Sequence, residues 1–370
     1  MAFNYSLAGV CEKIIRQTKD MVGQNYAFTL GRQVGALDFI TSEQNAGGFH
    51  AEYTQSQDGK KVVRAKVLYK QRALPCEVQT GSDAMDSSVC DTAIEPVEKS
   101  ADLTVADAIA TYPQKFTNEN LVQICQDSGT WIRDWLNSSL RAAREKLSEK
   151  IISKMAVGAG TLYRQDGTSV AAGTYQSVPI LKTNSDGVKF PLTANYNDVL
   201  MDFQNMQFQG VPAIITQGNF QTALNLMGKA CCNANTPYGD ALASAGAAFF
   251  LDQAANQVLG APGDSRYTRA LMASFGASQL LWFNMNANIE IDMEHLKSMT
   301  IQDPVYPELK WDLDMKFDIC TKTWAYQFSA RFDVFNTFKS DAFKQNDPSP
   351  ACDDELYGVT GIWKYQFGNV

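Results

Sequence analysis

Histidine is scarce in this sequence of 370 residues, which has only His50 and His295. Histidine is the usual general base and metal ligand near neutral pH. Each of the two stands alone, His50 in a segment that alternates like a strand and His295 in a polar stretch. The sequence also lacks a G-x-S-x-G elbow, a Walker A loop and an H-E-x-x-H motif. These absences predict that the chain is not an enzyme and needs no cofactor or metal.

Long apolar runs and paired cysteines are absent as well. No stretch approaches the roughly 20 apolar residues that a membrane-spanning helix needs, and the first residues do not read as a secretory signal. The eight cysteines form no C-x-x-C pair, and their spacings suit neither zinc nor a compact disulfide framework. We therefore expect reduced thiols, a cytosolic setting and no membrane partner.

Basic residues are fewer than acidic ones, with 32 Lys and Arg against 40 Asp and Glu, so the formal net charge is −8. A tight binder of nucleic acid normally carries a basic face, because its affinity comes mainly from neutralised phosphates. The dense basic group of the chain consists of Lys60, Lys61, Arg64, Lys66 and Lys70. This group favours a solvated face or a protein contact over a track for phosphates.

Acidic residues could form a catalytic site of their own, because paired carboxylates can hydrolyse glycosides without histidine. One cluster, in a loop that contains proline, is formed by Asp347, Asp353, Asp354 and Glu355. It is typical of a solvated run, with a calcium site as the weaker alternative. A second cluster, formed by Asp312, Asp314 and Asp318, alternates with apolar residues and predicts the polar face of a half-exposed strand. Neither cluster makes a case for catalysis.

The first hundred residues contain few core positions. Residues 1–48 mix short apolar pieces with glycine and polar residues and predict an extended arm that lies on another surface. A hairpin is expected next, with a turn at Asp58-Gly59 and a return strand over 63–70 whose polar face is basic. Residues 75–100 are acidic and rich in turn formers. Such segments favour a subunit that reaches its neighbours over a compact enzyme.

The strongest helical signal covers residues 118–157, which contain no proline and repeat apolar residues at helical spacing. Gly158 and Gly160 supply the stop signal. A continuous helix of this length would be roughly 60 Å long, at about 1.5 Å per residue, and would act as a spine. Gly129 is the position at which it could break early.

The rest of the chain predicts an α/β block followed by strands. The expected elements of the block, about 195–290, are a helix over 196–208, a strand over 211–216, helices near 220–227 and 249–259, and a strand over 280–283. Two long antiparallel strands are then expected over 311–317 and 324–334, and a final strand over 361–367. The fold class is therefore α+β.

This order of elements resembles the major capsid proteins of tailed bacteriophages, which have the HK97-type fold. The segments that carry the resemblance are 190–192 with the helix after it, 209–215, 250–253, 277–282, the strand pair that ends at Phe335, and 358–362. The resemblance covers most of the chain in layout.

The resemblance implies a role for each part of the chain. Those parts are an N-terminal arm (1–48), an extended hairpin loop (49–72), a peripheral domain with its spine helix (73–194), an α/β axial domain (195–300) and C-terminal strands that complete the peripheral β-sheet (301–370). The loop would contact a neighbouring subunit through Asp58, Gly59, Lys60, Lys61, Arg64 and Lys66. No motif supports the lysine–asparagine crosslink of some family members.

The implied function is self-assembly into pentamers and hexamers of an icosahedral shell around phage DNA, in the virion and, during assembly, in the host cytoplasm. Scaffolding, portal and decoration proteins are the implied partners; nothing resembles a scaffolding segment before the arm, so we expect a separate scaffolding protein or none. An acidic lining would contact double-stranded DNA weakly and without sequence specificity. The alternatives are an encapsulin-like shell for protein cargo and, less favoured, a soluble hydrolase that uses carboxylates.

Overall fold

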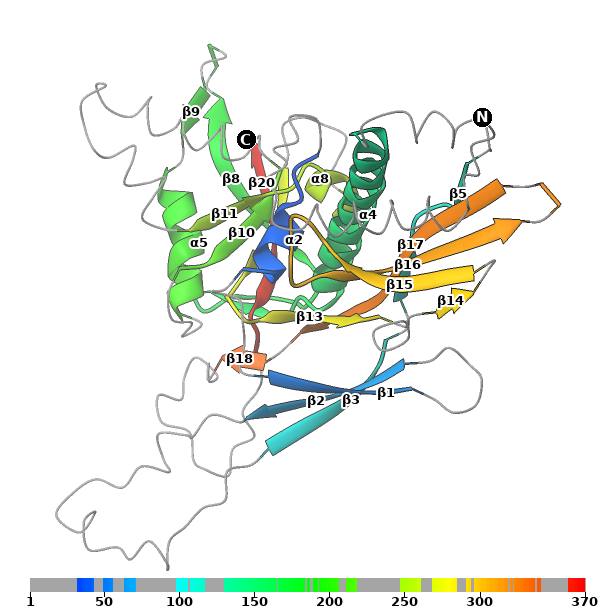
Figure 1. Ribbon diagram of the computed structural model, residues 1–370. Coiled ribbons are helices and arrows are strands. Elements are labelled where there is room, and N and C mark those ends of the chain that lie inside the picture. The colour runs from blue at the N-terminus through cyan, green and yellow to red at the C-terminus, as the bar shows by residue number, and fades with distance from the viewer. Residues whose placement is uncertain are drawn as a thin grey trace, which may run out of the picture. The chain divides into compact units, whose positions relative to one another are not determined.

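The computed structural model mixes helices and sheets (Figure 1). It describes residues 32–42, 49–55, 63–70, 98–105, 107–116, 130–164, 166–183, 185–186, 189–191, 193–205, 211–217, 247–260, 268–284, 291–293, 296–318, 320–321, 323–336, 338–340 and 359–369. These residues fall into two compact units. Unit 1 draws its residues from Met1–Gln33, Val105–Lys150 and Leu280–Asp333, and unit 2 from Val34–Thr104, Ile151–Gln279 and Val334–Val370.

The longest helix is α4, Thr130–Val157. The helix predicted over 118–157 is therefore confirmed over these 28 residues, while 118–129 lies outside the described residues. Its buried residues recur every three or four positions, as an amphipathic helix requires: Leu136, Leu140, Ala143, Leu147, Ile151 and Met155. The helix ends at Gly158, where a Cβ atom would lie 1.9 Å from the Nδ2 atom of Asn336. A larger residue at this stop would therefore require the Asn336 side chain to move.

Most of the seven-stranded sheet belongs to unit 1. Its strands are β4 (Asp107–Ala110), β5 (Gln114–Phe116), β13 (Ser278–Phe283), β14 (Ile291–Met293), β15 (Leu296–Gln302), β16 (Lys310–Asp318) and β17 (Thr323–Asn336). The order is β13-β17-β16-β15-β14. The short strands β4 and β5 lie outside this order and pair with β17. The predicted strand pair is confirmed, because β16 and β17 are antiparallel from Asp312↔Ser329 to Asp318↔Thr323. The strands β4 and β5 were not predicted.

Within unit 1, the buried carboxylate of Asp303 organises the turn between β15 and β16. Its Oδ1 accepts hydrogen bonds from Arg144 Nη1 on α4 at 3.0 Å and from the backbone N–H groups of Val305 and Tyr306 at 2.8 and 3.1 Å. Its Oδ2 accepts the indole N–H of Trp311 at 2.9 Å. The side chains of Arg144 and Asp303 are 6% and 0% exposed, so this ion pair is hardly screened by solvent.

The expected polar face of β16 needs a correction. Asp312 is only 1% exposed, and it accepts a hydrogen bond from Thr300 Oγ1 at 3.2 Å. Thr300 lies directly opposite it on β15, so a donor is available for a carboxylate that leaves water. Asp314 is bonded in the same way by the hydroxyl of Ser298. The alternation of β16 was predicted correctly, but the assumption that Asp312 faces water was wrong.

The six-stranded sheet belongs to unit 2 and contains β8 (Tyr175–Thr183), β9 (Lys189–Pro191), β10 (Ala213–Thr216), β11 (Ala248–Leu251), β12 (Thr268–Ala273) and β20 (Ile362–Asn369). The order is β11-β10-β12-β20-β8-β9. The resemblance implies that the C-terminal strands of 301–370 complete the peripheral domain, but the final strand does not join the seven-stranded sheet. Instead β20 pairs antiparallel with β12 and parallel with β8, because Trp363, Tyr365 and Phe367 complete the apolar core of unit 2.

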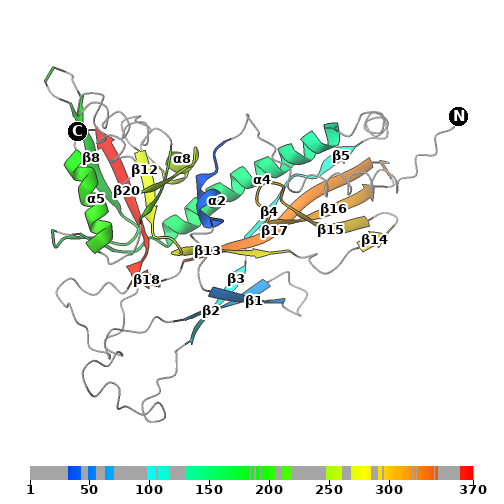
Figure 2. The same ribbon diagram turned by 60° about the vertical axis from the view of Figure 1, so that its left-hand side comes forward.

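Helices cover both faces of this sheet, as consecutive residues of β11 show. Phe249 packs with the core under helix α5 (Thr193–Asn205), in which Phe203 meets Trp363 edge to face at 6.0 Å. Phe250 contacts Phe39 of helix α2 (Gly35–Ile40), with ring centroids 5.4 Å apart. Neighbouring residues of a strand point to opposite faces, so α5 and α2 lie on opposite sides of the sheet (Figure 2).

The expected helix over 249–259 is replaced by β11 and a short helix, α8 (Ala255–Val258). The buried Asp252 separates them, and its Oδ1 accepts the backbone N–H of Ala254 at 2.9 Å. This bond from two residues further on forms an Asx turn, which separates the strand from the helix. The helix expected over 196–208 corresponds to α5, and the strand expected over 211–216 corresponds to β10. The helix expected near 220–227 lies outside the described residues.

The small sheets include the predicted hairpin. Strands β1 (Phe49–Gln55) and β2 (Val63–Lys70) pair antiparallel, from Phe49↔Tyr69 to Gln55↔Val63, and β3 (Glu98–Val105) adds a strand that was not predicted. Two further hairpins are β6–β7 (Leu162–Tyr163 and Ser169–Val170) and β18–β19 (Phe338–Ser340 and Val359–Thr360). In the described part of the chain, no helix combines the length and the apolar character needed to cross a membrane.

We predict that Asp303→Ala lowers the free energy of unfolding by about 3–5 kcal/mol, because it leaves the buried guanidinium of Arg144 without its counter-charge. Urea denaturation followed by tryptophan fluorescence measures this loss. The matched control is Glu308→Ala in the same turn, whose residue is exposed; its expected effect is within about 0.5 kcal/mol. Equal effects of the two substitutions would contradict the role given to Asp303.

Candidate functional site

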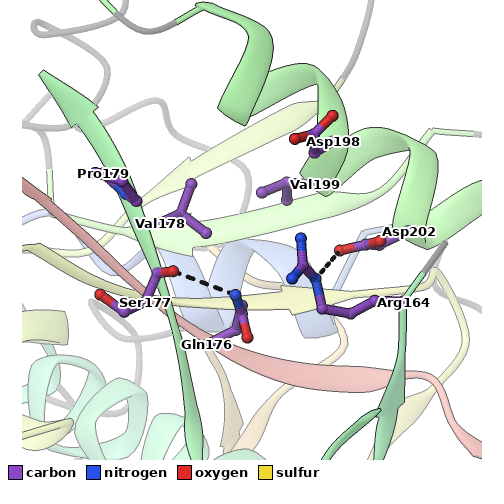
Figure 3. Close-up of a pocket in the computed structure, with 8 residues that line it drawn as sticks. All are labelled: Arg164, Gln176, Ser177, Val178, Pro179, Asp198, Val199 and Asp202. Carbon is purple, nitrogen blue, oxygen red and sulfur yellow. Dashed lines mark hydrogen bonds and ion pairs between the residues drawn. The ribbon is translucent and has the colours of Figure 1, made fainter. Parts of the chain in front are cut away.

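A pocket of about 210 Å³ opens in unit 2, where the β6–β7 hairpin, strand β8 and helix α5 meet (Figure 3). Its lining residues are Arg164, Gln176, Ser177, Val178, Pro179, Asp198, Val199 and Asp202. Arg164 follows β6, residues 176–179 belong to β8, and the two aspartates lie one turn apart on α5. The pocket is therefore built by three elements that only the folded unit brings together.

Arg164 holds these elements together by charge. Its Nε donates to Oδ2 of Asp202 at 3.4 Å and its Nη1 to Oδ2 of Asp166 at 3.0 Å. The other oxygen of Asp166 accepts both the backbone N–H and the hydroxyl of Thr168, at 2.9 and 2.5 Å. These hydrogen bonds from Thr168, with the charge of Arg164, hold the pKa of Asp166 below its usual value. The guanidinium thus ties the hairpin to α5.

Tyr365 of β20 is a second polar group in this part of unit 2. It is fully buried, and its hydroxyl has no hydrogen-bond partner among the residues that the structure describes. Burial raises the pKa of the phenol, the negative charge of Asp202 raises it further, and the positive charge of Arg164 lowers it. The phenol therefore stays neutral well into the alkaline range.

The pocket has little equipment for catalysis. Its lining contains neither histidine nor cysteine, and its hydroxyl comes from Ser177. A serine nucleophile needs an adjacent base, but the buried carboxylate of Asp202 is engaged by Arg164. The volume also lies below the range of about 300–1,000 Å³ that is usual for ligand pockets. We interpret the pocket as an ion-paired joint of the fold.

The predicted contact residues of the hairpin are only partly described. Arg64 and Lys66 belong to β2, where they lie opposite Thr54 and Glu52. The remaining four lie outside the described residues: Asp58, Gly59, Lys60 and Lys61. The role of all six in contacts between subunits stays a prediction.

Few of the other candidate residues lie in the part of the chain that the structure describes. His50 lies in β1, while His295 and the acidic loop of 347–355 lie outside the described residues. Cys320 has an exposed thiol in the turn after β16, and the other cysteines are outside the described residues. Among the residues that the structure describes, no three His, Cys, Asp or Glu are grouped so that they could hold a metal ion.

One cluster of charged residues was missed by the sequence analysis. Tyr175 of β8, Arg269 of β12 and Lys364 of β20 meet on the six-stranded sheet, with the guanidinium carbon of Arg269 at 4.0 Å and the ammonium nitrogen of Lys364 at 5.4 Å from the centroid of the tyrosine ring. Their separation along the chain leaves no local motif. Only the pairing of β20 with both β12 and β8 reveals the cluster.

Comparison with known proteins finds similar solved structures from phages. No family model and no curated protein matches the sequence. The capsid of Ralstonia phage GP4 is similar over 94% of this chain and 93% of that chain, with 11% identity and a TM-score of 0.45. The capsid of cyanophage A-1(L) is similar over 93% and 95%, with 13% identity and a TM-score of 0.46. The head of Helicobacter pylori bacteriophage KHP40 is similar over 85% and 86%, with 8% identity and a TM-score of 0.41.

The similar structures are thus phage capsids and heads. Their TM-scores lie below 0.5, and their identities do not exceed 13%. The function of this chain is therefore argued from its own residues.

We predict that Tyr365→Phe raises the free energy of unfolding by up to about 1 kcal/mol, because it removes a buried hydroxyl without a partner. The gain should grow above pH 10, because the phenol then ionises in the unfolded chain but not in the folded one, where its pKa is raised. Thermal unfolding at pH 7 and pH 10.5 measures both effects. As a control, Trp363→Phe empties volume in the same core and should destabilise at both pH values. A loss of stability in Tyr365→Phe would show that the hydroxyl has a partner.

Proposed function

We propose that this chain is the major capsid protein of a tailed bacteriophage, and that it assembles into pentamers and hexamers of an icosahedral shell around double-stranded DNA. The observation that carries the proposal is the small sheet β1-β2-β3. Among the described residues, its strands pair with one another and with no strand of the two large sheets. A sheet of three strands needs an apolar face packed against another surface to be stable.

The register of β1 and β2 supplies such a face. Residues directly opposite each other share a face, and one face combines Phe49 with Tyr69, Ala51 with Val67 and Tyr53 with Ala65. The other face combines His50 with Leu68, Glu52 with Lys66 and Thr54 with Arg64, so most of its positions are polar. The apolar row favours burial against protein. The basic positions favour an acidic surface, which a second copy with a net charge of −8 provides.

The architecture of the chain supports the same assignment. In the proposal, unit 1 is the peripheral domain, because it contains most of α4 and of the seven-stranded sheet. The six-stranded sheet of unit 2 is the centre of the axial domain, extended beyond the expected 195–300 by β8, β9 and β20. The hairpin of 49–72 is the loop over a neighbouring subunit, and scaffolding, portal and decoration proteins are the further partners.

Electron microscopy of the expressed protein tests the proposal. Negative staining, with and without a co-expressed scaffolding protein, should show closed shells of uniform size. Particles that contain DNA support the phage capsid, whereas particles filled with protein cargo would favour an encapsulin-like shell. A monodisperse monomer of 40.8 kDa at every concentration would contradict self-assembly altogether.

We predict that Arg64→Glu with Lys66→Glu raises the concentration needed for shell formation by at least about tenfold, which corresponds to about 1.4 kcal/mol per contact. Reversed charge on this face would repel an acidic neighbour. Light scattering against protein concentration measures the threshold. The control, Lys310→Glu with Lys316→Glu, makes the same charge change at exposed positions of β16. If the two double variants assemble equally, the hairpin is not the contact.

A further inference from the structure

The face of the six-stranded sheet opposite α5 is covered on one half only. Over β10 and β12 it is closed, and Ile215 and Leu271, which pair there, are both 0% exposed. Over β8 and β20 the same face stays accessible. Its residues there are Tyr175, Ser177, Lys364 and Gln366, each half-buried or exposed. Central strands of a sheet thus present a polar surface to the outside.

This surface and the adjacent Arg269 form a basic strip, defined by Tyr175, Arg269, Lys364 and Gln366. The register brings them together, since Lys364 lies opposite Tyr175 and Arg269 lies opposite Gln366. Arg269 Nε donates to Oε1 of Gln366 at 3.0 Å. Its guanidinium stacks on the ring of Tyr175, whose face attracts cations. Both cations are therefore held in place before any partner arrives.

Arg269 is fixed more firmly than Lys364. Its Nη1 donates to the backbone oxygens of Leu259, at 2.6 Å, and of Gly260. Tyr175 Oη donates to the same oxygen of Leu259 at 2.8 Å. Among the residues that the structure describes, the side chain of Lys364 makes one hydrogen bond, from Nζ to the backbone oxygen of Gly173 at 3.1 Å. A substitution at Lys364 therefore tests the strip without removing the contacts that hold the loop after α8.

Neither cation has a carboxylate partner among the residues that the structure describes. Among the described residues, every side-chain hydrogen bond of Arg269 and Lys364 goes to a neutral oxygen, either a backbone carbonyl or the amide of Gln366. Burial lowers the pKa of Lys364, and the positive charge of Arg269 lowers it further. Two like charges thus lie close together in a protein that has an excess of acidic residues. An added carboxylate would relieve this repulsion.

We propose that the basic strip binds an acidic side chain of a second copy of this chain, with the carboxylate between Arg269 and Lys364. The inference rests on the proposed function and adds a second contact to the hairpin. A neighbouring copy is rich in the required group, since the chain has 40 Asp and Glu against 32 Lys and Arg. The guanidinium is the group best suited to a carboxylate, which it can bind through two parallel hydrogen bonds.

A nucleic acid is the less favoured partner. Its affinity depends on many neutralised phosphates, commonly about 6–10, whereas the strip offers two cations. One carboxylate, by contrast, matches two cations that share a single aromatic ring.

Zero-length crosslinking of wild-type protein tests the contact directly. A carbodiimide joins a lysine amine to a carboxylate only when the two are in contact. Shells or oligomers are prepared from an equal mixture of unlabelled and ¹⁵N-labelled chains, so that mass spectrometry separates links between copies from links within one chain. The expected result is a mixed-isotope link from Lys364 to an Asp or Glu. The inference is overturned if other lysines form links between copies but Lys364 forms none.

Charge variants give the matching functional readout. Lys364→Glu should raise the assembly threshold at least about tenfold, Lys364→Gln should raise it less, and Lys364→Arg should leave it within about twofold. The control is Lys150→Glu, an identical charge change at an exposed position of α4; it should stay within about twofold of wild type. Circular dichroism and thermal unfolding verify that each variant is folded. Normal assembly of Lys364→Glu would overturn the inference, and so would normal shells that have lost DNA.

Failure of the inference and failure of the proposed function give different results. If wild-type shells form but Lys364 is neither crosslinked nor required, only the inference fails. If no shells form, sedimentation velocity at high concentration decides. Self-association of the wild type that Lys364→Glu abolishes would support the strip without the capsid. A wild-type monomer at all concentrations would overturn both.

Discussion

The pairing of β20 with β12 and β8 is the constraint on which unit 2 depends. The last described strand of the chain lies in the middle of the six-stranded sheet and joins β8 and β9 on one side to β10–β12 on the other. On one face it adds Trp363, Tyr365 and Phe367 to the core under α5. On the other face it places Lys364 beside Tyr175 and Gln366 beside Arg269. Core and surface of this unit thus arise from a single strand.

Such a constraint makes the subunit cooperative. The parallel strands β8 and β20 are far apart in the sequence, since Tyr175 pairs with Lys364. Their pairing therefore forms only after distant segments of the chain have met. The final residues therefore belong to the core of unit 2 and not to an accessory tail. In unit 1 the buried pair of Arg144 and Asp303 has a comparable position, because it joins α4 to a turn that lies 159 residues away.

Local pattern was sufficient to predict the hairpin strands β1 and β2, the long strands β16 and β17, and the described part of the long helix. The alternation along 311–317 and 324–334 survives in β16 and β17 because every second residue packs in the core. Which strands pair with one another, however, depends on the whole chain. Nothing in 361–367 distinguishes a neighbour in one sheet from a neighbour in the other, and the apolar residues of 249–259 fit a strand and a short helix as well as one helix. Asp312 was misjudged for the same reason, since its burial depends on a hydroxyl from another strand.

The candidate sites differ in the same way, because some follow from a local pattern and others depend on the whole fold. The basic group of the hairpin is contiguous, so the sequence reveals it. The basic strip and the pocket at Arg164 are assembled from distant residues, so only the fold reveals them. An acidic protein that assembles with itself faces a general repulsion between copies, which grows with the number of copies gathered. That repulsion is overcome most effectively where positive charge is concentrated and held ready by its own fold. Arg269 and Lys364, stacked on Tyr175 and without a carboxylate among the described residues, meet this condition. In such a protein, cations that the fold itself brings together and holds in place are the positions at which to look for its contacts.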